Sequence, residues 1–143
     1  MKLNLGCGYL KLNDAINIDL DKFYEPEIVW DLNKYPYPWE ENSIDEVIAK
    51  DIIEHLEKPY KFLEEIWRIL KKDGECKIVT PKYLHKNSWT DLTHLHHLTD
   101  QSLDYCDKRK EMCSKYPHVC NARFKIEVIE QSDSYTFNLV KEN

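Results

Sequence analysis

The chain has 143 residues, of which 42% are hydrophobic and 32% charged, as expected for a single soluble globular domain spanning 1–143 and not for a disordered or fibrous chain. Its net charge of -6 makes nucleic acid an unlikely partner, because binding to a phosphate backbone depends mainly on positive charge. No apolar run is long enough to span a membrane, and the chain opens on a strand-like segment instead of a signal peptide, so we expect a cytoplasmic protein.

Five short apolar segments predict the strands of a buried parallel sheet. They are partly β-branched and are separated by turn or helix signals. The segments are residues 2–5, 15–20, 27–30, 44–49 and 76–80. Only residues 9–14 separate the first glycine turn from the second strand, whereas a crossover helix normally needs about a dozen residues. The first helix is therefore predicted to be a single turn or absent.

One amphipathic helix is predicted between the fourth and fifth strands. Its apolar side chains recur at three- and four-residue steps, at Tyr60, Leu63, Ile66, Trp67 and Leu70. Pro59 marks the start, and the sequence Lys-Lys-Asp-Gly at 71–74 marks the stop.

The tail predicts an antiparallel hairpin at the edge of the sheet. Residues 124–130 alternate between apolar and polar side chains, and residues 135–140 follow after the polar link 131–134. Residues 83–121 are irregular and rich in His, Lys, Tyr and Cys, which indicates a loop or lid with short helices. The five cysteines, in a chain without an export signal, are expected to be thiols and not a disulfide framework.

Glycines and acids follow successive predicted strands. Gly6 and Gly8 come directly after the first strand, where the backbone can turn sharply and approach a ligand. Asp19 ends the second strand and Asp31 ends the third. The carboxyl ends of parallel strands converge on one crevice, where a carboxylate can accept the hydroxyl protons of a ribose. A dinucleotide is disfavoured, because the third glycine of a pyrophosphate-binding turn is absent. S-adenosylmethionine, which carries no phosphate, fits these groups better.

An ordered series of motifs over residues 2–81 resembles the class I, type 11-like methyltransferases that depend on S-adenosylmethionine. The motifs are Leu-Asn-Leu-Gly-Cys-Gly, Asn-Ile-Asp-Leu, Asp-Leu-Asn-Lys-Tyr-Pro, Ser-Ile-Asp-Glu-Val-Ile, Ile-Ile-Glu-His-Leu and Ile-Trp-Arg-Ile-Leu-Lys-Lys-Asp-Gly-Glu. The resemblance implies a Rossmann-like three-layer α/β sandwich with a mostly parallel seven-stranded sheet and a C-terminal antiparallel hairpin. Residues 1–81 would form the cofactor-binding half, and residues 82–143 the substrate loops and edge hairpin.

The same resemblance implies roles for individual residues toward the cofactor. It assigns the methionine end to the first glycine turn, the ribose to the end of the second strand, the adenine to the end of the third, and the sulfonium to the residues after the fourth. The residues for the methionine end are Asn4, Leu5, Gly6, Cys7 and Gly8, and those for the ribose are Asp19 with Leu20. The residues for the adenine are Asp31 with Leu32, and those beside the sulfonium are Lys50, Asp51 and His55. The product would be S-adenosyl-L-homocysteine.

Histidines are the candidate catalytic residues for transfer to the acceptor. His55 can titrate near neutrality and act as a base, or it can pack beside the cofactor without proton transfer. His94 and His97 belong to a second cluster after the fifth strand, on the side of the substrate loops. The acceptor is expected to be a small molecule or another soluble compound, methylated on oxygen, nitrogen or carbon. Base-amine methylation is disfavoured, since no Asn or Asp-Pro-Pro-Tyr or Phe run follows the fourth strand.

Three alternatives remain open at this stage. Metal ligands can be drawn from His94, His96, His97 and Asp91, or from Cys106, Cys113, Cys120 and His118, but the spacing is not that of a zinc knuckle and we expect no metal. A degenerate methyltransferase-fold binding module or partner subunit is the second functional hypothesis, supported by the missing third glycine and the short first connection. A homodimer through the edge hairpin or residues 83–121 is compatible with so small a domain.

Overall fold

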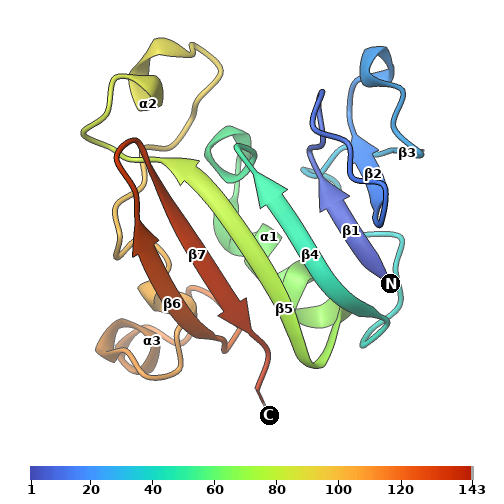
Figure 1. Cartoon of the computed structure of the whole chain (residues 1–143). Helices are drawn as coiled ribbons and strands as arrows, with labels where there is room; N and C mark the ends of the chain where they lie inside the picture. Colours follow the sequence, from blue (N-terminus) through green and yellow to red (C-terminus); the bar gives the residue numbers. More distant parts are fainter. Residues whose placement is uncertain (143) are drawn as a thin grey trace.

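The computed structural model describes residues 1–142, which form one seven-stranded sheet in the order β3-β2-β1-β4-β5-β7-β6 (Figure 1). The parallel strands are β1 (Lys2–Leu5), β2 (Ile16–Asp19), β3 (Ile28–Val29), β4 (Ile44–Lys50) and β5 (Leu70–Pro81). The hairpin of β6 (Lys125–Glu130) and β7 (Ser134–Val140) joins β5 through β7, which runs antiparallel to both neighbours. The predicted mostly parallel α/β sheet with a C-terminal antiparallel hairpin is confirmed.

Helix α1 (Pro59–Ile69) lies where the apolar periodicity predicts it. Pro59 occupies its first turn, where the missing N–H is not needed. The buried side chains are spaced by three and four residues and pack against the sheet, at Phe62, Leu63, Ile66 and Ile69. Full burial of such a side chain contributes about 1.5–3 kcal/mol, so this one stripe is enough to fix the helix on the sheet.

The remaining helices are short. They are the 3-10 helices η1 (Lys22–Tyr24), η2 (Ile53–His55) and η3 (Asp104–Cys106) and the α-helices α2 (Asn87–Thr90) and α3 (Glu111–Lys115). The connection between β1 and β2 contains no helix, as the sequence predicts. Leu12 of this connection, together with Lys2 and Ile48, lines a groove on the face of the sheet opposite α1. Figure 1 shows no α-helix crossing that face, so the third layer of the sandwich is reduced there to a loop.

Strand β5 begins earlier than the sequence indicates. Helix α1 ends at Ile69, and the strand starts at once at Leu70 instead of after the Lys-Lys-Asp-Gly stop. The pairing with β4 shifts between Ile44↔Leu70 and Glu46↔Glu75, so residues 71–74 form a bulge. Gly74 is required in this bulge, because a Cβ there would lie 2.9 Å from the carbonyl oxygen of Lys71.

Lys141 ties the end of β7 to the end of α1. Its buried Nζ donates hydrogen bonds to the carbonyl oxygens of Trp67 (2.6 Å) and Leu70 (2.7 Å) and to Oδ1 of Asn42 (2.8 Å). The ammonium therefore satisfies carbonyls that the last turn of a helix leaves without intrahelical partners.

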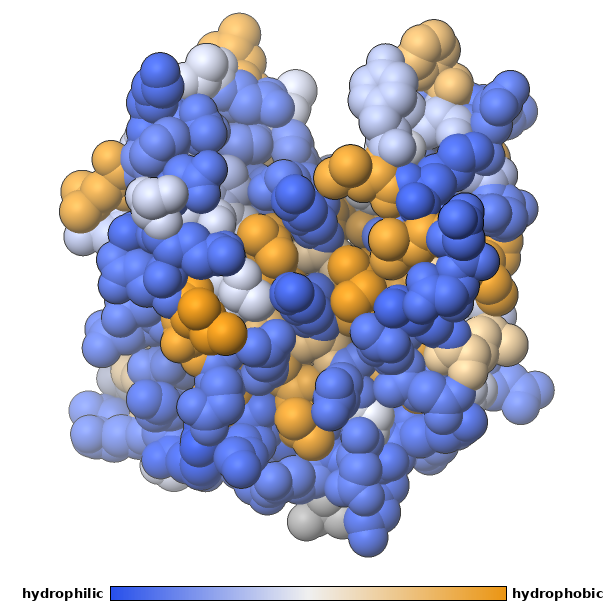
Figure 2. Space-filling view, viewed as in Figure 1, coloured by the Kyte–Doolittle hydropathy of each residue, from blue (hydrophilic) through white to orange (hydrophobic). Residues whose placement is uncertain are grey.

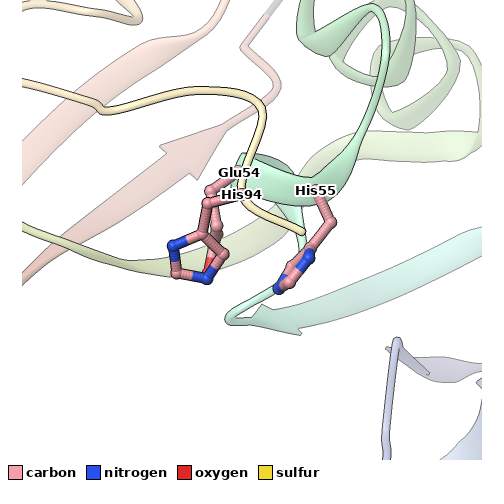
Figure 3. Close-up of side chains that lie close together, drawn as sticks. All are labelled: Glu54, His55 and His94. Atoms are coloured by element: carbon pink, nitrogen blue, oxygen red, sulfur yellow. The ribbon is translucent and has the colours of Figure 1, made fainter. Parts of the chain in front are cut away.

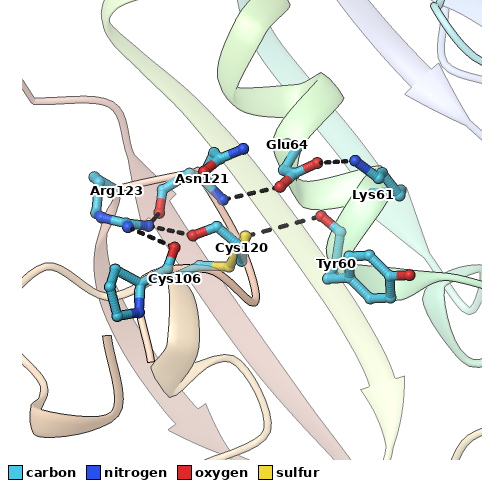
Figure 4. The surroundings of a disulfide bond; sticks show 9 residues. Tyr60, Lys61, Glu64, Cys106, Cys120, Asn121 and Arg123 are labelled. Atoms are coloured by element: carbon cyan, nitrogen blue, oxygen red, sulfur yellow. Dashed lines mark hydrogen bonds and ion pairs between the residues drawn. A yellow bond between two sulfur atoms is a disulfide. The ribbon is translucent and has the colours of Figure 1, made fainter. Parts of the chain in front are cut away.

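Cys106 and Cys120 form a disulfide, so the expectation of free thiols is wrong for this pair (Figure 4). Their Cα atoms lie 6.2 Å apart, within the usual range for a disulfide. The two cysteines lie 14 positions apart in sequence, a spacing that carries no pairing signal of its own. The bridged segment is held against α1, since the backbone N–H of Asn121 donates to Oε1 of Glu64 at 2.9 Å. The three other cysteines, Cys7, Cys76 and Cys113, are free and buried.

None of the helices within residues 1–142 combines the length and the apolar character needed to span a membrane.

Candidate functional site

The glycine turn after β1 borders open space at one residue and packed side chains at the other. Both glycines are left-handed, with φ of +66° at Gly6 and +48° at Gly8. A Cβ on Gly6 would lie 2.8 Å from Cγ1 of Ile52, whereas a Cβ on Gly8 would meet no atom within 4 Å. Gly6 is therefore required by the fold, and Gly8 is the point where a ligand can approach the backbone.

The carboxylate of Asp19 is fixed beside this turn. Its Oδ2 accepts a hydrogen bond from the backbone N–H of Gly8, and its Oδ1 accepts one from the N–H of Asp21, both at 2.9 Å. An ionised carboxylate offers about four acceptor positions, so two stay available for the hydroxyls of a sugar. The neighbouring Leu20 is 64% exposed and can cover a flat ligand.

The residues after β3 form a turn at the same edge of the sheet. Oδ1 of Asp31 accepts a hydrogen bond from the N–H of Asn33 at 2.9 Å, an Asx-turn that fixes the path of the chain. Leu32 is buried, and its carbonyl oxygen accepts a hydrogen bond from the hydroxyl of Tyr37 at 2.8 Å.

Three residues of the first glycine turn that are assigned to the cofactor have buried side chains. Nδ2 of Asn4 donates to the carbonyl oxygen of Leu10 and to Oδ1 of Asn17, each at 2.8 Å, so it braces the first connection. Leu5 lies in the core, and burial raises the pKa of the Cys7 thiol. Since these side chains are buried, the glycine turn offers its backbone to a ligand in the crevice.

Beyond β4 the chain turns sharply at Asp51. This residue is left-handed, with φ of +53°, and its N–H donates to the carbonyl oxygen of Val79 at 2.8 Å. A non-glycine residue held in this conformation at the end of a central strand is often part of a functional site. Lys50, directly before it, is exposed.

Glu54, His55 and His94 lie together at the carboxyl ends of β4 and β5 (Figure 3). Helix η2 supplies Glu54 and His55, and the loop after α2 supplies His94. The loop is held in place by Glu54, whose carbonyl oxygen accepts hydrogen bonds from the N–H groups of Leu95 (2.8 Å) and His96 (3.1 Å). The rings of His55 and His94 meet edge to face, with centroids 4.6 Å apart.

Hydrogen bonds fix the orientation of both rings. Nδ1 of His94 lies 2.9 Å from the carbonyl oxygen of Ser88, which can only accept, so Nδ1 carries the proton. Nδ1 of His55 lies 3.0 Å from the Thr93 hydroxyl, which donates its own proton to Oδ1 of Asp91 at 2.7 Å. The Thr93 oxygen therefore accepts from His55. With Nδ1 of each ring donating a hydrogen bond, Nε2 is the nitrogen that can accept a proton or bind a ligand.

Burial shapes the charge of this group. It raises the pKa of Glu54 to about 7, although the hydroxyl of Thr80 donates to its Oε2 at 2.9 Å. Burial, followed by the nearby charge of His94, lowers the pKa of His55 and favours its neutral form. A group of this kind at the carboxyl edge of a parallel sheet is typical of a reactive site.

A groove of ≈ 1020 Å³ runs from this group onto the face of the sheet that carries no helix. Near the carboxyl ends of β4 and β5 the groove is lined by Asp51, Glu54, His55, Asp91 and His94. Figure 2 shows the molecule hollowed above the parallel strands, between the lobe of α2 and the lobe of β2 and β3.

The predicted catalytic residues lie in two separate cavities. His55 and His94 share the groove, whereas His97 lines a separate cavity of ≈ 220 Å³ and stacks on Trp89 with ring centroids 3.5 Å apart. Glu54 is not among the site residues predicted from the sequence. Its signal is an acid inside the apolar segment Ile-Ile-Glu-His-Leu, and such an acid is rarely buried without a function or a partner.

Comparison with known proteins agrees with this geometry. The methyltransferase domain family matches residues 3–78, more than half of the chain. The chain belongs to this methyltransferase family. The match covers β1 to β5 and therefore the glycine turn, Asp19, Asp31 and the Glu54–His55 pair. No curated protein matches the chain.

Solved structures show that the fold is that of S-adenosylmethionine-dependent methyltransferases. An enzyme of this kind from Archaeoglobus fulgidus superposes with a TM-score of 0.74 at 14% identity, covering 98% of this chain and 85% of its own. The YcgJ protein of Bacillus subtilis gives 0.68 at 14% identity, covering 99% and 92%. A chain from the complex between the Haloferax volcanii Trm112 methyltransferase activator and a methyltransferase gives 0.69 at 14%, covering 99% and 82%.

Proposed function

We propose that the protein is an enzyme that transfers a methyl group from S-adenosylmethionine to a small-molecule or other soluble acceptor, on oxygen, nitrogen or carbon. The observation that carries this proposal is the meeting of a glycine turn open to a ligand, at Gly8, with the fixed carboxylate of Asp19. The family match and the shared fold support the same cofactor.

The chain offers a partner for each part of the cofactor. The backbone of residues 6–8 would bind the methionine end, Asp19 would accept the ribose hydroxyls, and the turn at Asp31 and Leu32 would hold the adenine against Leu20. Lys50, Asp51 and His55 would border the sulfonium. When bound, S-adenosylmethionine supplies an electrophilic methyl group on a positively charged sulfur.

The acceptor would enter through the groove beside His55 and His94. Its electron pair forms the new bond to the methyl carbon while the carbon–sulfur bond breaks, the electrons of that bond remain on sulfur, and S-adenosylhomocysteine is released. A hydroxyl or amine acceptor also gives up a proton. His55 and His94 line the groove with Nε2 as the nitrogen that can accept a proton, and they would stand beside that position. Alignment of the acceptor and exclusion of water supply much of the acceleration in such a displacement.

The proposal is tested by measuring S-adenosylhomocysteine formation with a panel of small hydroxyl, amine and carbon acceptors. We expect turnover with at least one acceptor, at least tenfold slower turnover by His94→Ala under the same conditions, and unchanged turnover by His118→Ala, whose side chain is exposed and does not line the groove. Equal turnover by wild type and His94→Ala would contradict the role given to this residue.

A partner subunit without activity of its own is the second candidate function. It is favoured by the uncovered face of the sheet and by the similarity to a chain from a complex with a methyltransferase activator. A protein of this kind would bind S-adenosylmethionine and form no product until a partner protein is added. A homodimer through the edge hairpin or residues 83–121 is compatible with either function, and the mass of the protein in solution would reveal it.

A further inference from the structure

We propose that Glu54, His55 and His94 form a binding site for a divalent transition-metal ion at the acceptor end of the groove (Figure 3). One carboxylate oxygen and two imidazole nitrogens, one from each residue, lie within 4.8 Å of one another. Two histidines and one carboxylate that leave further positions open are a common ligand set for zinc, iron and manganese in enzymes. The sequence alone suggests other ligand sets, which combine His94 with Asp91, His96 and His97, or three cysteines with His118.

The unpaired oxygen of Glu54 points to a missing ligand. The Glu54 side chain is 1% exposed, and Thr80 satisfies its Oε2, but its Oε1 has no hydrogen-bond partner in the described part of the chain. Among residues 1–142, no lysine or arginine forms an ion pair with it; its close basic neighbour is His94, with Nε2 3.9 Å from Oε1. That distance is too long for a hydrogen bond and leaves room for an ion between the two atoms. A buried carboxylate oxygen without a partner is costly, and a cation would remove that cost.

Both histidines are prepared as metal ligands by their outer contacts. Metal-binding histidines commonly donate one ring N–H to a carbonyl or carboxylate, which fixes the other nitrogen as the ligand. His94 donates from Nδ1 to the carbonyl of Ser88, and His55 donates from Nδ1 to the hydroxyl of Thr93. Thr93 is in turn bonded to Asp91, so the carboxylate strengthens the chain of hydrogen bonds.

The three ligand atoms need to approach one another only slightly to bind an ion. Donor atoms about 2.1 Å from a tetrahedral ion lie about 3.4 Å from one another. The pair of His94 and Glu54 at 3.9 Å is close to this value, and rotation of the side chains can provide the rest. Oδ2 of Asp91, 3.7 Å from Nε2 of His94, is placed to act as a further ligand or to bind a water on the ion.

The other candidate metal ligands named from the sequence have different contacts in the structure. Cys106 and Cys120 are bonded to each other and cannot bind metal as thiolates. Nδ1 of His97 lies 2.8 Å from the hydroxyl of Ser88, and both His96 and His97 line the separate cavity. Of the nearby histidines, His94 is the one that faces the groove with His55.

The ion would determine which acceptors fit. Glu54, His55 and His94 all line the groove, so the ion's remaining positions would be open to an acceptor hydroxyl, or to two adjacent oxygens, and the ion would lower the pKa of the bound hydroxyl. Because the Nε2 atoms of His55 and His94 would then be ligands of the ion and not free bases, the acceptor oxygen would give its proton to solvent and receive the methyl group as an ether. This role in catalysis rests on the proposed methyltransferase activity, but the metal site itself rests only on the residues described.

The test is a titration of tag-free protein, freed of metal with a chelator and dialysed, with Zn²⁺, Mn²⁺ and Co²⁺ separately. We expect one saturable site for at least one of the three ions, with affinity at least tenfold weaker in Glu54→Gln and in His94→Ala. His118→Ala is the matched control and should bind as the wild type does. For Co²⁺, visible absorption bands should appear in the wild type and be lost in His94→Ala.

Absence of saturable binding for all three ions would overturn the proposal, and so would equal binding by the wild type and both variants. Thr93→Val gives an independent check that leaves all three ligands in place, and it should weaken binding as well, because it frees the ring of His55. S-adenosylmethionine binding is measured on the same metal-free samples. S-adenosylmethionine would bind at Gly8 and Asp19. Its binding therefore reports on a different place in the crevice from metal binding, and the two results are interpreted separately.

Discussion

Substitution of the two glycines after β1 should separate folding from cofactor binding. Gly6→Ala places a Cβ 2.8–2.9 Å from three side-chain atoms of Ile52 at a φ of +66°. The left-handed conformation costs an alanine about 1–2 kcal/mol, partly offset by about 0.4–1 kcal/mol from the stiffer unfolded chain, and overpacking adds about 1–3 kcal/mol. We expect Gly6→Ala to lower the free energy of unfolding by about 2–4 kcal/mol.

Gly8→Ala has a similar backbone conformation but no steric conflict. Its φ is +48° and its Cβ would meet no atom within 4 Å, so only the backbone term remains, about 1 kcal/mol. That Cβ would instead project into the space assigned to the cofactor. We expect Gly8→Ala to fold nearly as stably as the wild type and to bind S-adenosylmethionine at least tenfold more weakly.

Urea unfolding and calorimetric titration with S-adenosylmethionine measure the two effects on the same samples. The double variant Gly6→Ala, Ile52→Ala removes the conflicting side chain and tests whether overpacking is the cause, since the two substitutions should then be non-additive. If Gly8→Ala bound the cofactor as tightly as the wild type, the ligand would not approach the backbone at Gly8, and the reasoning would be wrong.

Three further predictions concern stability. Reduction of the Cys106–Cys120 disulfide, which closes a short loop, should lower the free energy of unfolding by about 3 kcal/mol, seen as a lower melting temperature that Cys106→Ala reproduces without reductant. Lys141→Met should destabilise by about 2–4 kcal/mol in urea unfolding, because it strips a buried donor from three acceptors. Burial opposes the charge of Asp107, but hydrogen bonds from Arg109 outweigh it and lower the pKa of Asp107. Its contribution is present above the unfolded pKa of about 4 and is lost as pH falls through the lower folded pKa, so the stability gap to Asp107→Asn should shrink in acid.

The sequence predicts the parts of the fold that depend on local pattern. The three- and four-residue spacing of Leu63, Ile66 and Leu70 identifies α1, and the alternation around Ile126 identifies the hairpin. The bounds of β5 depend instead on its neighbours. The bulge at residues 71–74 exists because β4 and the backbone of Lys141 pair with both of its ends, and no local pattern encodes that pairing.

The site divides in the same way. Gly8 and Asp19 are predictable because each follows a strand, and the ends of parallel strands meet. The group of Glu54, His55 and His94 joins segments that are far apart in the chain, and its geometry depends on how Glu54 holds the loop at Leu95. The pairing of Cys106 with Cys120 likewise depends on the path of the segment over α1, which residue spacing does not determine.

The central claim is that the crevice at Gly8 and Asp19 binds S-adenosylmethionine. Calorimetric titration with S-adenosylmethionine and S-adenosylhomocysteine tests it most directly, on the wild type, on Asp19→Ala, and on Asp100→Ala as an exposed acidic control outside the crevice. We predict saturable binding with one site, unchanged in Asp100→Ala and weakened about 30- to 150-fold in Asp19→Ala, equivalent to about 2–3 kcal/mol for the lost charged hydrogen bonds. No binding by the wild type, or equal binding by Asp19→Ala, would contradict the account.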